Sequence, residues 1–499
     1  MMLKNHTNLN PLMKSIAKIS ACLVLFAVFT SDSFGATTFT KEFWISTNTV
    51  TGDLGTLDDP YDGSTATKFD ARMAAMPENC TVHILAGTYQ TAGYQNTGDW
   101  VVKHGEHIIG SGIDVTTIHL ARTNQYTTAI ITPWETTAGG YELSDLTVDL
   151  SGTVDTSAVL LQGINSAVRR VKVVNVTSSG PELWPIGIGQ GIVEDCEVSK
   201  FIGGSCSAIA VFFEDYTVFR NNRVYLQNTG NTQTNGNPFA FNVASSRNVL
   251  IEGNYVNYAA CGVYSDAASN TNLTIVNNTF ANCDHALALL NHPHQNITFC
   301  FNTIKSPNET NTYWAIWFAT TGGGVSIYHT NVLIAGNTFA FDSTLGSPVH
   351  VIVSGTIVGL TVVNNAIDSR YSETSGDLAG DTGVNIYNNT DLFGIASPIF
   401  NEIIPPNSLT RHTISANYSA AYADRYIGVQ TTNACTITLP SAVGFAGKEF
   451  IVANETSGSA GITVNPTSPD KINGSTTYTF TAGYSGRSVI SDGANWFAR

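Results

Sequence analysis

A six-residue pattern recurs along the middle of this chain and constrains its fold more than any other feature. Each copy begins and ends with an apolar residue. The nine copies are LSDLTV (143–148), VRRVKV (168–173), VEDCEV (193–198), FRNNRV (219–224), IEGNYV (251–256), IVNNTF (275–280), FCFNTI (299–304), IAGNTF (334–339) and VVNNAI (362–367). Successive copies end between 24 residues (Val256 to Phe280) and 35 residues (Ile304 to Phe339) apart. Such a period, rich in β-branched and aromatic residues, predicts a solenoid of stacked strands.

Six of the nine copies share an asparagine, and these residues are predicted to stand at the corners of successive coils. Asparagine tolerates the left-handed backbone conformation that a tight corner demands, and stacked amides can bond from one coil to the next. The shared residues are Asn222, Asn254, Asn278, Asn302, Asn337 and Asn365. The pattern therefore predicts an all-β, right-handed parallel β-helix with an asparagine ladder along one corner.

The first 35 residues are typical of a secretory signal peptide. Lys14 and Lys18 precede an apolar run from Ala21 to Phe29, and small residues precede the expected cleavage after Gly35. We therefore expect a protein that is secreted or displayed on a bacterial cell surface. No later stretch of the sequence is apolar enough to cross a bilayer, so no transmembrane segment is expected.

The chain is acidic, with 23 Lys and Arg against 38 Asp and Glu and a net charge of −15 at pH 7. Such a surface disfavours nucleic acid and anionic membranes as partners. An acidic polysaccharide stays open as a partner, because a few arginines or a bound cation such as Ca²⁺ can dominate locally. No other cofactor is expected. Most cysteines should be small buried hydrophobes, with one disulfide left open between Cys261 and Cys283 on neighbouring coils.

Residues 40–125 are predicted to form an N-terminal cap on a β-helix domain that spans 36–405, with coils over 105–400. Within residues 64–76, Phe69, Met73 and Met76 recur at helical spacing and a proline follows, so a helix is expected there. Such a helix covers the apolar end and the unpaired edge of the first coil. Two stretches, VHILAGTY (82–89) and IIGSG (108–112), resemble the opening of secreted bacterial pectin-lyase-like β-helix proteins. The resemblance implies that fold and a polysaccharide as the substrate class.

After residue 410 the period disappears, and short strands alternate with Gly, Asn and Ser turns. We expect a small C-terminal β domain over 410–499, with a boundary at Pro405-Pro406. This segment resembles β domains near the C-termini of phage tail and bacterial surface proteins. By that resemblance a trimer is left open, although no heptad supports an oligomer.

The catalytic signatures of β-helix enzymes are not transferable to this chain. The Asn-Thr-Asp, Asp-Asp and Arg-x-Lys elements of polygalacturonases are not found in the required arrangement, and the Arg-x-Pro-x-x-Arg of pectate lyases is absent. The Asp-Pro-His-Asp of alginate epimerases has only the counterpart His292-Pro293-His294-Gln295, which lacks both acids. The resemblance therefore implies a fold and a substrate class without catalytic residues.

A candidate site follows from the alternation of side chains along strands. If Val211, Phe213, Phe241, Val243, Val263, Ile316 and Phe318 face the core, then Phe212, Asn242, Tyr264 and Trp317 face outward. Glu214 and Asp266 would lie one step further along and two coils apart, roughly 9–10 Å, near the upper separation of an inverting glycosidase pair. His292, on the next coil, could carry protons, and Arg247 is the nearest cation. The alternative is that Glu214 is a solvated acid and that Asp266 caps its own turn.

Two functions follow from these observations. The first is a secreted enzyme, a polysaccharide lyase or glycoside hydrolase acting on an acidic polysaccharide, with Glu214, Asp266 and His292 as catalytic residues. Asn242, Arg247, Tyr264 and Trp317 would bind the substrate. The second is a non-catalytic surface or adhesive protein that binds glycans through the same face.

Overall fold

The computed structural model describes residues 41–48, 52–95, 99–124, 126–132, 139–178, 184–202, 207–212, 214–227, 238–266, 268–305, 313–318, 321–322, 325–326, 328–340, 349–353, 357–368, 371, 381, 384–387, 389–392, 411–420, 424, 426–442, 448–459 and 461–499. The expected signal peptide and the expected boundary at Pro405-Pro406 lie outside these residues.

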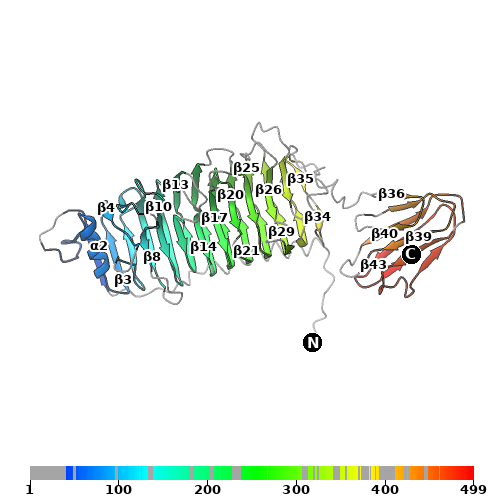
Figure 1. Cartoon of the computed structure of the whole chain (residues 1–499), viewed down its shortest axis with the longest axis horizontal. Helices are drawn as coiled ribbons and strands as arrows, with labels where there is room; N and C mark the ends of the chain where they lie inside the picture. Colours follow the sequence, from blue (N-terminus) through cyan, green and yellow to red (C-terminus); the bar gives the residue numbers. More distant parts are fainter. Residues whose placement is uncertain are drawn as a thin grey trace, which may run out of the picture.

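Two long parallel sheets form the body of the molecule, which is a right-handed parallel β-helix as expected (Figure 1). Sheet A has 24 strands: β1 (Lys41–Ser46), β2 (Tyr61–Asp62), β3 (Cys80–Ile84), β4 (Gly87–Thr91), β5 (His107–Gly110), β6 (Thr116–Leu120), β8 (Glu142–Asp149), β10 (Ser166–Val174), β12 (Gly191–Glu194), β13 (Glu197–Ile202), β15 (Asp215–Arg220), β16 (Arg223–Gln227), β18 (Arg247–Glu252), β19 (Tyr255–Asn257), β21 (Thr271–Val276), β22 (Thr279–Ala281), β24 (Gln295–Cys300), β25 (Thr303–Lys305), β29 (His329–Ala335), β30 (Thr338–Ala340), β32 (Ile357–Val363), β33 (Ala366–Ile367), β34 (Asn385–Tyr387) and β35 (Thr390–Asp391). Sheet B has nine strands: β7 (Thr128–Ile131), β9 (Ser157–Leu161), β11 (Ile186–Ile188), β14 (Ser207–Phe212), β17 (Phe239–Ala244), β20 (Cys261–Ser265), β23 (His285–Leu289), β26 (Tyr313–Phe318) and β31 (Val349–Val353).

Each coil in the middle of the body contributes two strands to sheet A and one to sheet B. In one such coil, β18 and β19 meet at the asparagine corner and β20 closes the coil. Figure 1 shows these coils stacked along one long axis, from the end that carries the helix α2 to β34 and β35. Aliphatic and aromatic side chains from both sheets fill one continuous core.

The helix α2 (Ala66–Ala75) stands where the sequence predicts the cap. The Thr65 hydroxyl accepts a hydrogen bond from Lys68 N (3.3 Å) and so caps the N-terminus of α2. Phe69 is fully buried, with its ring centroid 5.5 Å from that of Tyr89 and 6.2 Å from that of Trp100. The helix therefore buries its apolar face on the first coils. No helix in the described ranges is long and apolar enough to span a membrane.

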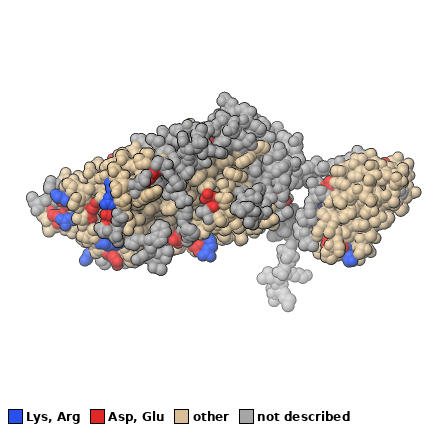
Figure 2. Space-filling view, viewed as in Figure 1, with Lys and Arg blue, Asp and Glu red and all other residues tan. Residues whose placement is uncertain are grey.

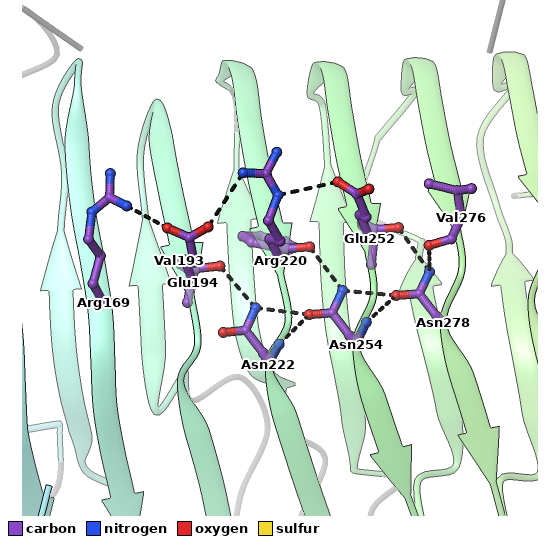
Figure 3. Close-up of polar contacts among 11 residues, drawn as sticks. Arg169, Val193, Glu194, Arg220, Asn222, Glu252, Asn254, Val276 and Asn278 are labelled. Carbon is purple, nitrogen blue, oxygen red and sulfur yellow. Dashed lines mark hydrogen bonds and ion pairs between the residues drawn. The ribbon is translucent and has the colours of Figure 1, made fainter. Parts of the chain in front are cut away.

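The shared asparagines bond to one another along the corner between the two strands of each coil (Figure 3). Asn278 Oδ1 accepts from both Asn254 N (2.9 Å) and Asn254 Nδ2 (2.9 Å). Asn278 Nδ2 donates to Asn302 Oδ1 (3.0 Å) and to Ile251 O (2.8 Å). The column also continues to Asn389, whose Oδ1 accepts from Asn365 Nδ2 (2.9 Å). Asn389 was not predicted, because Asp391 stands where the motif has its last apolar residue.

The expectation that these asparagines adopt the left-handed conformation is wrong, because that conformation belongs to the residue before each of them. Positive φ angles occur at Asn221 (55°), Gly253 (66°), Asn277 (56°), Phe301 (56°), Gly336 (66°) and Asn364 (56°). The left-handed residue turns the chain. The shared asparagine that follows it is at most 1% exposed in every copy from Asn222 to Asn365. The amide column is thus an interior feature.

A row of alternating charges runs along the outer side of sheet A, beside the asparagine ladder (Figure 3). Glu194 lies between Arg169 and Arg220, and Arg220 bonds onward to Glu252. The strand register sets these four residues at one level on successive coils. Each charge therefore has a partner of opposite sign on a neighbouring coil, so this row offers no free cation.

Two further polar columns cross the coils at the corner that leads from sheet B into sheet A. The inner column contains Ser246, Asn270, His294 and His329, all fully or almost fully buried. Ser246 N donates to Asn270 Oδ1 (2.9 Å), and Asn270 N donates to His294 Nδ1 (3.1 Å). The outer column contains Asn248, Asn272, Asn296 and Asn331, whose amides bond from coil to coil at 2.8–3.0 Å.

The cysteines in the described ranges are all buried. Cys261 and Cys283 are separate thiols, so the disulfide left open by the sequence is not formed. The Cys283 thiol donates to Ala281 O (3.3 Å) within its own corner, and burial raises its pKa to about 12. Cys283 therefore acts as a small core residue.

Small residues line the start of the sheet B strands, and they explain a glycine in β20. Gly262 faces the core, where a Cβ would lie 2.3 Å from the ring of Phe280 and 2.7 Å from Ala286 O. The preceding and following coils have Ala240 and Ala286 at the same level. Space beside Phe280 therefore decides that position 262 is glycine.

Gly262→Ala is expected to lower the free energy of unfolding by about 1–3 kcal/mol, because the added methyl group overpacks the core. Urea unfolding of both proteins measures the difference. The double variant Gly262→Ala/Phe280→Leu is the control. A smaller side chain at 280 should make the added methyl group less harmful than it is beside phenylalanine. Equal penalties in both backgrounds would show that Phe280 is not the obstacle.

Residues 411–499 form two sheets of their own around a second core that includes Ile427, Phe450 and Trp496. One sheet contains β36 (Arg411–Ile414), β38 (Tyr426–Val429), β40 (Glu449–Asn454), β43 (Ser485–Ser491) and β44 (Trp496–Ala498), and the other contains β37 (Tyr418–Ser419), β39 (Cys435–Leu439), β41 (Ile462–Pro466) and β42 (Tyr478–Phe480). Whether this part folds independently stays a prediction.

Candidate functional site

Three of the sequence-predicted residues share one level on the outer face of sheet B. The register pairs Asn242 with Tyr264, Tyr264 with Ala288, and Ala288 with Trp317. Asn242, Tyr264 and Trp317 are half-buried, whereas the neighbouring Phe241, Val263 and Ile316 are fully buried. The register places Ala210 of β14 at this level, so Phe212, which the sequence predicts to face outward, is not level with this row.

Aromatic rings extend this row into a strip over four coils, which we call the aromatic strip: Phe239, Tyr264, His285, Trp314 and Trp317. Phe239 stacks on Tyr264 with ring centroids 3.7 Å apart. Trp314 lies 5.2 Å from Trp317, and His285 lies 5.5 Å from Trp317. His285 Nδ1 and Trp314 O are 2.6 Å apart, so the imidazole is fixed against the next coil. Each ring is half-buried.

Strict alternation hid three members of the strip. Phe239, His285 and Trp314 have the same parity as Phe241, Leu287 and Ile316, so alternation assigns them to the core. In β17, β23 and β26 two successive residues contact the core instead, as Ala286 and Leu287 do in β23. Residues three apart, such as Trp314 and Trp317, therefore face outward together. The only sequence signal is the small residue that precedes each large core residue.

Asp266 lies beside the strip through a single hydrogen bond. Tyr264 donates its hydroxyl to Asp266 Oδ2 at 2.6 Å. Burial, together with this hydrogen bond, raises the pKa of Tyr264 well above its ordinary value. Because Asp266 accepts a hydrogen bond from a tyrosine of the strip, its carboxylate lies beside the aromatic strip.

Glu214 lies elsewhere, at the level of the inner polar column. The register pairs Asp215 with Arg247 and Arg247 with Thr271, so Glu214 is level with Ser246 and Asn270. The expectation that Glu214 and Asp266 lie at the same level, two coils apart, is therefore wrong. The distance of roughly 9–10 Å that was expected between them followed from that shared level and no longer applies. Only two residues separate β14 from β15, whereas five separate β20 from β21.

Glu214 and Arg247 line a polar hollow of about 420 Å³ at this corner, together with Gln190, Asp215, Ser245, Ser269 and Thr271. Burial, followed by the nearby Asp215 charge, raises the pKa of Glu214. Arg247 Nε and Nη2 donate to the two oxygens of Asp215, both at 2.7 Å. Arg247 is thus already paired with a carboxylate.

His292 is half-buried in the loop before β24, and its backbone N–H donates to Leu290 O (2.7 Å). Across the described ranges, no hydrogen bond or ion pair joins Glu214, Asp266 and His292 to one another. The three candidate catalytic side chains are therefore not assembled into one contact network. Nor is a group of three or more His, Cys, Asp or Glu placed to hold a metal ion in this part of the chain.

No protein-family model and no curated protein sequence matches the chain. Its fold is similar to that of the tailspike protein of E. coli bacteriophage HK620, a double mutant in complex with a pentasaccharide. That similarity has a TM-score of 0.50 and 11% identity and covers 89% of this chain and 92% of that one. The Azotobacter vinelandii mannuronan C-5 epimerase AlgE6 A-module gives a TM-score of 0.45 and 17% identity over 65% of this chain and 94% of that one. The resemblance to pectin-lyase-like parallel β-helix proteins is confirmed for the fold.

Proposed function

We propose that this protein binds a polysaccharide along the outer face of sheet B, with the aromatic strip as its main contact. The observation that supports this proposal most is that aromatic rings from four successive coils lie together on the outer face of sheet B, outside the hydrophobic core. Tyrosine and tryptophan present flat apolar faces with a polar edge, which suits the alternating C–H faces and hydroxyls of sugar rings. A rigid solenoid repeats such contacts along a line, as an extended glycan requires.

Asn242 adds a polar contact at one end of the strip. Its Oδ1 is buried and has no hydrogen-bond partner among the described groups. A buried carbonyl oxygen without a donor is costly, and a sugar hydroxyl would supply the donor. The expected signal peptide fits a protein that meets glycans outside the cell.

The geometry favours binding over catalysis. A glycosidase pair needs two carboxyl groups about 5–5.5 Å apart, or about 6.5–9.5 Å apart, across one bond. Asp266 is bonded to Tyr264, while Glu214 lies in the corner hollow at a different level. The alternative is a polysaccharide lyase or glycoside hydrolase in which Asp266 transfers the proton. Tyr264 supports that alternative, because its hydroxyl contacts the carboxylate directly.

Trp317→Ala is expected to weaken polysaccharide affinity by about ten-fold or more, as truncation of a central aromatic contact does. Affinity electrophoresis against plant, algal and bacterial polysaccharides, both neutral and acidic, identifies the retained polymers and measures the change. Tyr484→Ala removes a ring that is 76% exposed in the turn before β43 of the C-terminal part and is the control. Thermal unfolding of each variant verifies that the fold is kept. Equal retention of Trp317→Ala and wild type would contradict the proposed site.

The same polymers test the enzymatic alternative. New reducing ends would indicate cleavage, and ultraviolet absorbance from unsaturated uronates would indicate a lyase. If product forms and Asp266→Asn abolishes it while binding persists, the alternative replaces the binding function. If no product forms with any retained polymer, the protein is a binding protein.

A further inference from the structure

The strands of sheet B are free of formal charge. None of the nine described strands contains Lys, Arg, Asp or Glu. His285 is the titratable member of the aromatic strip that could become a cation, and burial lowers its pKa. Its imidazole therefore stays neutral at pH 7. The contact surface proposed above consists of neutral rings and one amide.

The charges that border the strip on the described residues are mainly negative. Asp266 is held beside Tyr264, and Glu214 and Asp215 line the adjacent hollow. The cation of that hollow, Arg247, is bonded at both Nε and Nη2 to Asp215. On the face drawn in Figure 2, the charged side chains of the described residues gather toward the end that carries α2, and fewer of them lie over the middle of the β-helix body. The whole chain has a net charge of −15.

From this charge pattern we infer that the ligand is an uncharged polysaccharide, without carboxylate or sulfate groups. The inference rests on the proposed function and names its ligand class. A uronate or sulfated chain on this face would meet Asp266, and Arg247, the cation of the adjacent hollow among the described residues, is already paired with Asp215. Like charges at a contact reject a ligand. An uncharged polysaccharide is not repelled by Asp266, and its binding does not depend on an ion pair with arginine. The acidic polysaccharide expected from the sequence is thus disfavoured at this face.

A matched pair of polymers tests the inference. Each neutral polymer retained in the screen is compared with its own derivative, in which C6 hydroxymethyl groups are oxidised to carboxylates. We expect the derivative to bind at least about five-fold more weakly at low ionic strength. The difference in affinity between the neutral polymer and its derivative should become smaller in about 0.5 M salt, where interactions between charges more than a few ångströms apart are screened. Galacturonan and alginate should not be retained.

A charge variant tests the cause. Asp266→Asn should raise affinity for the oxidised polymer by about three-fold at low salt, since it removes the nearest like charge. Asp58→Asn changes the net charge by the same amount at an exposed site on the cap and should leave that affinity unchanged. If Asp266→Asn does not change affinity for the oxidised polymer, repulsion by Asp266 is excluded and the inference fails.

The outcomes separate this inference from the proposed function. Galacturonan, alginate or the oxidised polymers could bind as tightly as the neutral ones, with Trp317→Ala weakening that binding. In that case the proposed glycan site is supported and the inference of an uncharged ligand is wrong. If no polymer is retained, or Trp317→Ala weakens none, the proposed function itself is wrong and this inference falls with it.

Discussion

Replacing Asn278 with aspartate should lower the free energy of unfolding by about 3–5 kcal/mol at neutral pH, as an uncompensated buried charge does. Asn278 Nδ2 donates to Ile251 O (2.8 Å), Val276 O (3.0 Å) and Asn302 Oδ1 (3.0 Å). A carboxylate has no hydrogen to donate and would face all three oxygens. Protonating it at pH 7 instead costs about 4 kcal/mol from an ordinary aspartate pKa. Neither protonation state of the new side chain avoids the penalty.

The outer asparagine column provides a matched control for this substitution. Asn296 is exposed, and its Nδ2 donates to Asn272 Oδ1 (2.9 Å) on the preceding coil. Asn296→Asp makes the same chemical change, but water can solvate the carboxylate, so a change within about 0.5 kcal/mol is expected. Chemical unfolding at pH 7 and pH 5 measures both variants. The Asn278→Asp penalty should shrink at pH 5, where protonation is easier. Equal stability of the two variants would contradict a buried ladder.

The architecture was predictable from the sequence because each coil of a solenoid appears in the chain as one copy of a repeat. Each coil repeats the same apolar frame, so nine copies give the same information and no long-range pairing has to be guessed. The cap helix was predictable for a similar reason, since Phe69 and Met73 recur at helical spacing and bury the face that the first coil exposes. The level of each residue on the outer face was not predictable in this way.

The level of a residue on the outer face depends on how many residues separate the strands and on where strict alternation fails, and both vary from coil to coil. Glu214 was misplaced because two residues separate β14 from β15, whereas five separate β20 from β21. Phe239 and Trp314 were not predicted as members of the strip, because two successive residues contact the core in these strands and strict alternation does not place residues three apart on one face. Asn242, Tyr264 and Trp317 were predicted together because they come later in their strands, where alternation holds.

The inner polar column was also missed, although its signal is readable. Ser246, Asn270, His294 and His329 each stand two residues before the asparagine of the outer column. His294 was interpreted as part of a loop next to Pro293. His294 does lie in that loop, but its ring is fully buried and stacks on that of His329, with ring centroids 5.4 Å apart and planes 1° apart.

His294 should make the protein sensitive to acid. Burial, followed by the nearby His329 and His292, lowers the pKa of His294 from 6.5 to about 3. Its Nδ1 accepts from Asn270 N, and its Nε2 has no partner in the described structure. Above pH 6.5 the ring is neutral in both the folded and the unfolded state and contributes no pH dependence. Below pH 6.5 the unfolded chain binds the proton and the folded chain does not, so stability falls with pH until about pH 3.

His294→Asn isolates this contribution, because an asparagine oxygen can accept the same hydrogen bond from Asn270 N and does not titrate. Between pH 6.5 and pH 4, the free energy of unfolding of the wild type should fall by roughly 3 kcal/mol more than that of the variant, at about 1.4 kcal/mol per pH unit. Urea unfolding at each pH measures both proteins. His292→Asn, on the same loop and half-buried, should leave most of that difference in place. If the free energy of unfolding changed with pH in the same way for wild type and His294→Asn, His294 would take up its proton in the folded protein as readily as in the unfolded chain. His294 could then not be the source of acid sensitivity.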